Sequence, residues 1–278
     1  GGTATLIGDP PNIMIGSAAN LSFFDFLIYD GPAVLIILVA CIAMFYFLYG
    51  RKLTVEEDKK NAVMALNEND AIHNPTLFKK SVVMIILVAI AFVAHGAFHI
   101  EPSVIALTSA AVMLLISGTD IETIMVDVEW STIGFFAGLF VVVGGLAETG
   151  VINMMAYALI DLTGGDMMIT IIVLVWASAI ISSFLDNIPL VATLIPIIIT
   201  MESTGMDVMP LWWAVSLGAC LGGVGTLIGA SANVVMASIS ARNGYPITFI
   251  EYLKVGFPVM IVCTAIACVY CVVRFCVF

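Results

Sequence analysis

An acidic residue and an asparagine interrupt a long apolar stretch in the second half of the chain. Asp186 and Asn187 stand in the segment SSFLDNIP, in the middle of the run from Met167 to Met201. An ionised side chain in such surroundings costs about 2.5–3.5 kcal/mol on membrane-insertion scales, so we expect it to have a function. Burial favours a protonated carboxyl group and a bound cation favours the carboxylate, so Asp186 is suited to exchange a proton for Na⁺. The alternative is that Asp186 caps the helix that begins at Asn187.

Two glycine-rich segments supply further polar groups. GGTATLIGDPPN at residues 1–12 and GGVGTLIGASAN at residues 222–233 are identical at seven of twelve positions. A continuous helix is disfavoured where glycines cluster, because each costs up to about 1 kcal/mol relative to alanine. Unwound backbone inside a bilayer is tolerated only against protein or water, where its free amide and carbonyl groups become ligands. We predict a broken helix over residues 211–242 and its counterpart at the start of the chain.

The predicted binding site combines side-chain oxygens with glycines that let the backbone approach an ion. Threonine, serine and asparagine in the two segments suit Na⁺ or an oxyanion. Asp9 is a second acidic group, either a ligand or the cap of a helix that begins at Pro10. The candidate ligands are Thr5, Asp9, Asn12, Ser183, Asp186, Asn187, Gly223, Thr226, Gly229, Ser231 and Asn233, and Na⁺ is expected at Asn187, Thr226 and Asn233.

The elements that must position these residues are membrane-spanning helices. Of the 278 residues, 62% are hydrophobic and 10% are charged, and the formal net charge is -11. This composition excludes a soluble domain, and the negative charge excludes nucleic acid as a partner. Apolar runs of nearly 20 residues recur, the first over residues 31–49, so we predict an all-α polytopic protein in a lipid bilayer. The sequence holds no enzyme signature, although it is compatible with an associated ATPase subunit.

Basic residues fix the predicted orientation. Six of the nine lysines and arginines lie in residues 50–80, which places this linker in the cytoplasm by the positive-inside rule. Counted from the linker, the two glycine-rich copies cross the membrane in opposite directions. SFFDFL at residues 22–27 and TFIEYL at residues 248–253 extend the match, so each copy is predicted as a broken helix, an amphipathic segment and a span. Inverted repeats with interrupted helices are typical of secondary transporters, whose site lies near the midplane.

We therefore predict three parts of the chain. Residues 1–49 are the remainder of a first inverted repeat, residues 50–80 are the linker, and residues 81–278 are the second repeat, which includes a re-entrant hairpin over 167–201 and the broken helix over 211–242. Because Gly1 would lie inside a membrane-crossing element, we expect the N-terminal part of a longer transporter to precede it.

Four stretches in this order carry a resemblance to a known family. They are GGTATLIGDPPNIMIGSAA, VEWSTIGFFAGLFVVVGGLAETG, SSFLDNIPLVATLIP and PLWWAVSLGACLGGVGTLIGASANVV. The sequence resembles the ArsB/NhaD permeases of the ion transporter superfamily, which includes arsenite exporters, sodium/proton antiporters and the melanosomal P protein. The resemblance implies a citrate-transporter-like fold, an elevator-like moving domain around the substrate, and pairing of two copies through a scaffold domain. Val224 departs from the family, which usually has asparagine there, and this puts the usual ion coordination in doubt.

The predicted function is secondary active transport across a membrane. The substrate is a small ion, namely Na⁺, arsenite or another anion, coupled to H⁺ or Na⁺ and needing no cofactor. We expect a multi-pass protein of the bacterial inner membrane that is not an enzyme. Two alternatives are an intramembrane hydrolase, with Asp186 and Asp9 as paired acids, and a transport-inactive fragment of a longer transporter.

Overall fold

The computed structural model describes residues 1–52, 54, 56–67, 72, 74–98, 100–128 and 130–277, so part of the predicted linker lies outside the described residues. The described residues form helices and no strand, which confirms the predicted all-α class. They separate into two compact units, one made of Gly1–Cys41 with Trp130–Phe278 and one of Ile42–Glu129. All the candidate site residues belong to the first unit. The predicted division into two repeats follows sequence similarity and stays a prediction.

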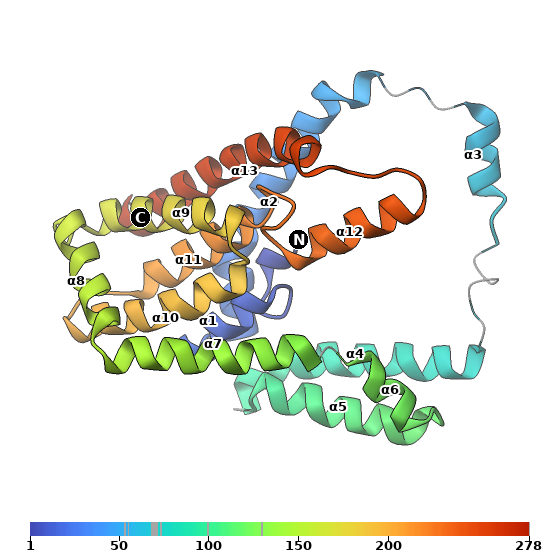
Figure 1. The fold of residues 1–278 in the computed structure, drawn as a ribbon, viewed down its shortest axis with the longest axis horizontal. Helices are drawn as coiled ribbons and strands as arrows, with labels where there is room; N and C mark the ends of the chain where they lie inside the picture. The colour runs from blue at the N-terminus through green and yellow to red at the C-terminus, as the bar shows by residue number, and fades with distance from the viewer. Residues whose placement is uncertain are drawn as a thin grey trace. The chain divides into compact units, whose positions relative to one another are not determined.

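The first unit contains the helices that build the site (Figure 1). Its elements are η1 (Gly2–Ala4), α1 (Pro10–Ala19), most of α2 (Phe23–Leu48), α7 (Trp130–Glu148), α8 (Val151–Thr163), α9 (Met167–Phe184), α10 (Asn187–Ser203), α11 (Met209–Gly222), α12 (Ser231–Arg242), α13 (Phe249–Val272) and the π-helical turn η4 (Val273–Val277). The second unit holds the end of α2 with η2 (Gly50–Lys52), α3 (Glu57–Met64), α4 (Pro75–Phe98), α5 (Pro102–Ser117) and α6 (Ile121–Asp127).

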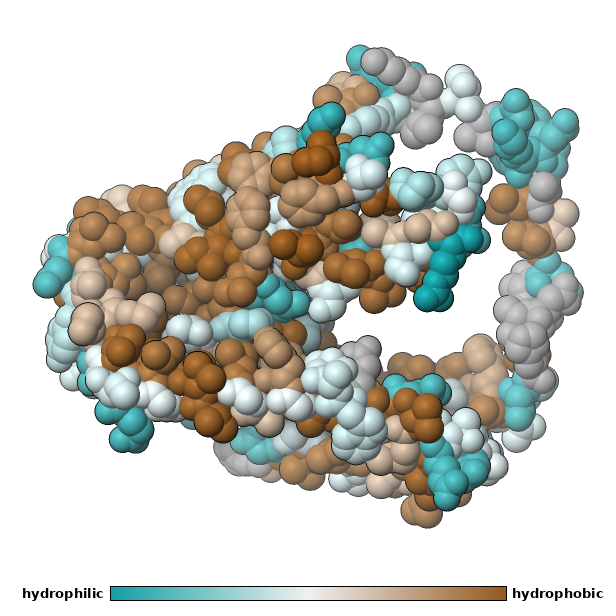
Figure 2. Space-filling model, in the orientation of Figure 1, coloured by the Kyte–Doolittle hydropathy of each residue, from teal (hydrophilic) through white to brown (hydrophobic). Residues whose placement is uncertain are grey.

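Five described helices are long and apolar enough to cross a membrane. They are Phe23–Leu48, Pro75–Gly96, Trp130–Glu148, Met167–Phe184 and Phe249–Val277. In the view of Figure 2, hydrophobic side chains cover much of the outer face of α7, α9 and α13, as lipid contact requires. At 18 residues, α9 covers about 27 Å, which suffices for a crossing. The re-entrant course of the α9–α10 hairpin therefore stays a prediction.

The two long helices that follow the glycine-rich segments begin in the same way. Before α2, the amide and hydroxyl of Ser22 donate to the Asp25 carboxylate at 2.7 Å each, and the Asp25 amide donates to the Ser22 hydroxyl at 3.3 Å. Thr248 and Glu251 make the same three hydrogen bonds before α13, at 2.9, 2.8 and 3.3 Å. These are capping boxes, which satisfy free amides at a helix start. The second sequence match is therefore also a structural match.

The predicted separation of an amphipathic segment from the span that follows it is wrong. α2 runs without interruption from Phe23 through Pro32, and α13 runs from Phe249 through Pro258. The capping boxes start both helices early, and each interior proline removes only one backbone hydrogen bond, which membrane helices tolerate. The amphipathic segment is the first part of the same helix in both copies.

α11 lies against α9 over its whole length, with α13 packed on both helices (Figure 1). Small residues permit this close contact. A Cβ atom at Gly218 would lie 2.7 Å from the carbonyl oxygen of Val175, and one at Gly222 would lie 2.7 Å from the Cα of Ala179. Every residue of α11 except the first is buried, so this helix is the centre of the first unit.

We expect Gly218→Ala to destabilise the protein by about 1–3 kcal/mol, because the added methyl group forces α11 away from α9. Gly138→Ala on α7 is the matched control, since a Cβ atom there meets nothing within 4 Å. The control should be neutral or stabilising by up to about 1 kcal/mol. Thermal unfolding of the full-length protein in detergent measures both, and equal shifts for the two variants would contradict the close packing.

Candidate functional site

The two glycine-rich segments have the same local structure. The first turns at Asp9 into α1, and the second links α11 to α12 through residues 223–230. The residues before the two helices are extended, Asp9 at φ -146° and ψ 137°, Ala230 at φ -152° and ψ 141°. Gly8 donates its amide to the carbonyl of Thr5 at 3.2 Å, as Gly229 does to Thr226 at 3.3 Å. The predicted break in the helix over 211–242 is confirmed.

An asparagine at the same place in each copy holds its loop together. Asn12 Nδ2 donates to the carbonyls of Thr3 and Thr5 at 3.1 and 3.0 Å. Asn233 Nδ2 donates to the carbonyls of Gly223 and Thr226 at 2.8 and 3.0 Å. An amide nitrogen has two hydrogens, so both are used in each copy and only the amide oxygen is free for another partner.

The tip of the α9–α10 hairpin contacts both loops. Asp186 caps α10, because its Oδ1 accepts from the amide of Ile188 at 3.1 Å. Its Oδ2 accepts from the hydroxyl of Ser231, the first residue of α12, at 3.1 Å. Asn187 Nδ2 lies 3.4 and 3.3 Å from the two carboxylate oxygens of Asp9. The tip is thus bonded to one helix start from each copy.

The end of α9 is also fixed to the second loop. Ser183 Oγ donates to the carbonyl of Gly222 at 3.1 Å, and the hydroxyl of Thr226 donates to the carbonyl of Ser183. A Cβ atom at Gly229 would lie 3.0 Å from the carbonyl oxygen of Ser182, so a glycine is needed where the two backbones meet. These bonds make the hairpin and the loop one packed body.

We call Asp9, Asp186, Asn187 and Ser231 the polar cluster. Asp9 precedes α1 without capping it through its side chain, and the charge of Asp186 acts on the Asp9 carboxyl group. The sequence has no lysine or arginine in residues 1–50 or 81–241, so the only basic residue of the helices that begin at the cluster is Arg242, at the far end of α12. Two neighbouring carboxyl groups without a basic partner favour a bound cation or a proton.

The structure places the predicted residues in three groups. Asp9, Asp186, Asn187 and Ser231 form the polar cluster through their side chains. Asn12, Ser183, Thr226 and Asn233 use side-chain donors to hold backbone carbonyls. Thr5, Gly223 and Gly229 lie in the loops themselves. Ion binding by all three groups, including Na⁺ at Asn187, Thr226 and Asn233, stays a prediction.

The sequence reasoning missed a buried acidic residue. Asp30 lies inside α2 with none of its surface exposed, and its Oδ2 lies 2.6 Å from the hydroxyl of Ser216 in α11. The same hydroxyl lies 2.9 Å from Asn12 Oδ1. The available signal was an aspartate within the apolar segment FLIYDGPAVL, which was overlooked because the span was counted from Gly31.

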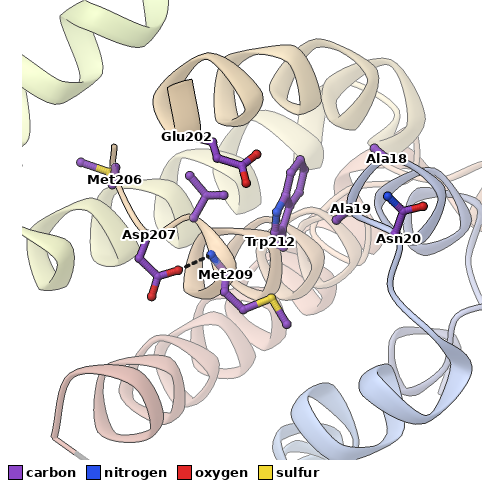
Figure 3. A pocket seen from close by; sticks show the side chains of 9 residues that line it. Ala18, Ala19, Asn20, Glu202, Met206, Asp207, Met209 and Trp212 are labelled. Atoms are coloured by element: carbon purple, nitrogen blue, oxygen red, sulfur yellow. Dashed lines mark hydrogen bonds between the residues drawn. The ribbon is translucent and has the colours of Figure 1, made fainter. Parts of the chain in front are cut away.

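A separate pocket of about 300 Å³ lies at the opposite ends of α1, α10 and α11 from the polar cluster (Figure 3). Asp207 points to the start of α11, where its Oδ1 accepts a hydrogen bond from the amide of Met209 at 3.1 Å. α11 has 14 residues and covers about 21 Å between this pocket at its start and the second loop at its end. The lining residues are Ala18, Ala19, Asn20, Glu202, Met206, Asp207, Val208, Met209 and Trp212.

Interrupted backbone and acidic side chains gathered among apolar helices are features of membrane transport proteins. The family model described as citrate transporter matches residues 1–218. The chain belongs to this citrate transporter family. The predicted resemblance to the ArsB/NhaD-like permeases is confirmed.

Several transporters are similar to the chain. It is 45% identical over 279 residues to the uncharacterized transporter Rv2684 of Mycobacterium tuberculosis, covering 99% of this chain and 65% of that protein. It is 33% identical over 296 residues to the uncharacterized transporter slr0753 of Synechocystis, covering 97% of this chain and 64% of that protein. The human P protein is 30% identical over 349 residues, which cover 96% of this chain and 42% of that protein. The chain thus spans somewhat less than two thirds of the length of the first two relatives.

Replacing Asn233 with alanine leaves the buried carbonyls of Gly223 and Thr226 without the side-chain donor. We expect a loss of about 1–3 kcal/mol in the free energy of unfolding, because each unpaired buried group retains its desolvation cost. Asn243→Ala is the matched control, since Asn243 is exposed and donates only to the carbonyl of Ile239 at 2.8 Å. Thermal unfolding of both variants in detergent gives the comparison. A shift as small as that of the control would show that Asn233 does not hold the loop.

Proposed function

We propose that this protein is a secondary active transporter that binds Na⁺ at the polar cluster and exchanges it for H⁺. The observation that carries the proposal is the contact of one hairpin tip with both helix breaks, through Asn187 to Asp9 and through Asp186 to Ser231. The tip supplies an amide and a carboxylate, and the breaks supply the carboxylate of Asp9 and the hydroxyl of Ser231. Carboxylate, amide and carbonyl oxygens are the ligands that hard cations prefer.

The charges of the cluster favour a cation over an anion. α1, α10 and α12 all begin at the cluster, and a helix start carries a partial positive charge that attracts anions. Asp9 precedes α1 and Asp186 precedes α10, so carboxylates of the protein itself already occupy two of these three helix starts. The only basic residue of these three helices, Arg242, lies at the end of α12 that is farther from the cluster, so it does not receive an anionic substrate there. A cation offsets the two carboxylates without any other counter-charge.

The interlocked contacts support an elevator-like, alternating-access mechanism. The hydrogen bonds among α1, the α9–α10 hairpin and the α11–α12 loop join segments from opposite ends of the chain. Segments joined in this way can move together as one body, because the hydrogen bonds of the broken backbone are kept during the movement. Deforming the segments would break these bonds inside the membrane. Such a body would carry the ion between the two faces of the membrane, here the bacterial inner membrane.

A carboxylate anion is the second candidate substrate. The family description, citrate transporter, favours it, and α12 begins at Ser231 without a capping side chain of its own. An anion at this helix start would need a cation at Asp9 and Asp186 to balance the cluster. Na⁺-coupled transport of citrate then replaces Na⁺/H⁺ exchange. Arsenite, as a small oxyanion or as its neutral acid, is tested beside Na⁺ and citrate.

The paired carboxyl groups also bear on the hydrolase alternative. An intramembrane aspartyl hydrolase needs two carboxyl groups that share a site, and Asp9 and Asp186 are the two available here. Membership in a family of transporters supports transport and gives no support to catalysis. Peptide cleavage that disappears in Asp186→Asn while ion flux persists would reverse this preference.

Proteoliposomes that contain the full-length protein and an internal pH-sensitive dye test the proposal. We expect an imposed Na⁺ gradient to drive proton movement. Asp9→Asn should raise the Na⁺ concentration for half-maximal rate by about tenfold or more, because it removes one charged ligand. Asp161→Asn is the control, since this aspartate is exposed on α8 away from the cluster.

The outcomes separate the candidates. Proton movement driven by citrate together with Na⁺, and not by Na⁺ alone, would favour carboxylate transport. Proton movement driven by arsenite would favour an arsenite carrier. If none of the three gradients moves protons, in vesicles where the protein is shown to be folded, Na⁺/H⁺ exchange and proton-coupled transport of these ions are contradicted. An Asp9→Asn variant with unchanged Na⁺ dependence would remove the polar cluster as the binding site.

A further inference from the structure

Asp30 is a fully buried carboxyl group that the proposed Na⁺ site does not use. Its Oδ2 has one hydrogen-bond partner, the hydroxyl of Ser216 at 2.6 Å, and its Oδ1 is buried without a partner among the described residues. The salt bridges of the described residues join Lys59 to Glu56 and Lys60 to Glu57, so none involves Asp30. A buried carboxylate with one hydrogen bond and no counter-charge is costly, whereas a buried carboxylic acid is not.

Ser216 connects Asp30 to the first helix break. Its oxygen lies 2.6 Å from Asp30 Oδ2 and 2.9 Å from Asn12 Oδ1, and the Asn12 amide nitrogen holds the carbonyls of Thr3 and Thr5. A hydroxyl group has a single hydrogen and so donates to one acceptor at a time. The protonation state of Asp30 therefore decides whether Ser216 donates its hydrogen to Asp30 or to Asn12.

The two protonation states give two different hydrogen-bond chains. When Asp30 is a carboxylic acid, its proton is donated to the Ser216 oxygen, and Ser216 donates to Asn12. When Asp30 is a carboxylate, Ser216 must donate to Asp30, and Asn12 Oδ1 retains only the weak thiol donor of Cys220 at 3.4 Å. Protonation thus strengthens the bonding of the loop that leads to Asp9, and loss of the proton weakens it.

The other titratable groups near Asp30 give it no fixed positive partner. Cys220 in α11 and Tyr270 and Cys271 in α13 act on it electrostatically, and all three are neutral when protonated. Arg274 in η4 makes a cation–π contact with Tyr29, in which the guanidinium carbon lies 5.4 Å from the centroid of the ring. α9 and α1 contain no titratable residue.

We propose that Asp30 binds the proton that is exchanged for Na⁺, and that Ser216 and Asn12 transmit its protonation state to the ion-binding cluster. The proposal rests on the Na⁺/H⁺ exchange proposed above and adds a proton site separate from the cation site. The step is a simple acid–base equilibrium, in which the Asp30 carboxylate takes one proton from water that reaches it in one state of the transport cycle. Ser216 and Asn12 are positioning residues in this scheme.

The direction of coupling follows from charge and bonding together. Ionised Asp30 adds a negative charge near the cluster and frees the first loop to adjust around Na⁺. Protonated Asp30 removes that charge and holds the loop in its sodium-free form. Na⁺ and the proton therefore oppose each other, so the affinity for Na⁺ rises with pH, by up to about tenfold per pH unit for one coupled proton.

Equilibrium binding of Na⁺ to the purified full-length protein, measured by calorimetry from acidic to alkaline pH, tests the proposal. Asp30→Asn should bind Na⁺ with an affinity that changes less than about twofold over the range in which the wild type changes at least tenfold. Asn keeps the shape and donates to Ser216 as the carboxylic acid does. Asp9→Asn should instead lose Na⁺ affinity at every pH, which separates the two sites.

Infrared difference spectroscopy supplies a readout that needs no transport. The carbonyl band of a protonated carboxyl group should titrate in the wild type and be missing in Asp30→Asn. Ser216→Ala should keep the band but weaken the pH dependence of Na⁺ binding, and Ser216→Thr, which restores the hydroxyl group, should recover it. Asp161→Asn is the control in both measurements.

Each outcome decides one of the two proposals. Asp30→Asn with the full pH dependence of the wild type, or with an unchanged titrating band, would overturn the role of Asp30. A wild type that binds no Na⁺ would overturn the Na⁺ site, while the infrared band would still show whether Asp30 takes up a proton. If Asp30→Asn does not fold, Ser216→Ala and Ser216→Thr carry the same test.

Discussion

The structure depends on pairing the backbone where helices are broken among apolar neighbours. Lipid offers no hydrogen bonds, so every carbonyl that a break exposes must find a partner within the protein. Here an asparagine in the first turn of the helix after each loop supplies the partners, and Thr226 and Ser183 supply them between loop and hairpin. Once the loops are held in this way, the acidic residues at the helix starts lie where Asp9 meets Asn187 and Asp186 meets Ser231. The polar cluster is therefore a consequence of backbone pairing.

This dependence explains why the two loops keep one structure although their sequences differ. The asparagines bond to backbone carbonyl groups, those of Thr3 and Thr5 in the first copy and those of Gly223 and Thr226 in the second, so these contacts do not depend on the side chains of the loops. Val224 thus leaves the loop intact, and its effect is confined to what its side chain would offer an ion. Where backbones touch, by contrast, the residue type is fixed: Gly229 lies against the Ser182 carbonyl, and Gly218 against that of Val175.

The features predicted correctly from sequence are those determined by neighbours along the chain. Glycine clustering predicted the helix break over 211–242, and the dipeptide Asp186-Asn187 predicted the turn between two helical arms. The long starts of α2 and α13 were missed because the capping boxes were interpreted as part of an amphipathic segment. Asp30 was missed for a different reason. The local signal, an aspartate inside the apolar segment FLIYDGPAVL, was overlooked, and no local pattern encodes its contact with Ser216 of α11, more than 170 residues further along the chain.

The two copies share a scaffold but differ in their chemistry. Asp9 corresponds to Ala230 by the alignment of the loops, and Asp30 corresponds to Gly256 by the alignment of the capping boxes and of Pro32 with Pro258. In the second copy α13 lies directly on its loop, since a Cβ atom at Gly256 would be 2.7 Å from the carbonyl oxygen of Val224.

An acidic side chain has no space at Gly256, whereas in the first copy Asp30 reaches its loop through Ser216. Asp9 of the proposed cation site and Asp30, the proposed proton site, thus both occur in the first copy, and Asn12 lies between them along the chain. The second copy contributes the packing that fixes the hairpin, and its Ser231 bonds to the remaining acid, Asp186. Such a division lets one copy change its protonation without disturbing the contacts that keep the broken backbone paired in the other.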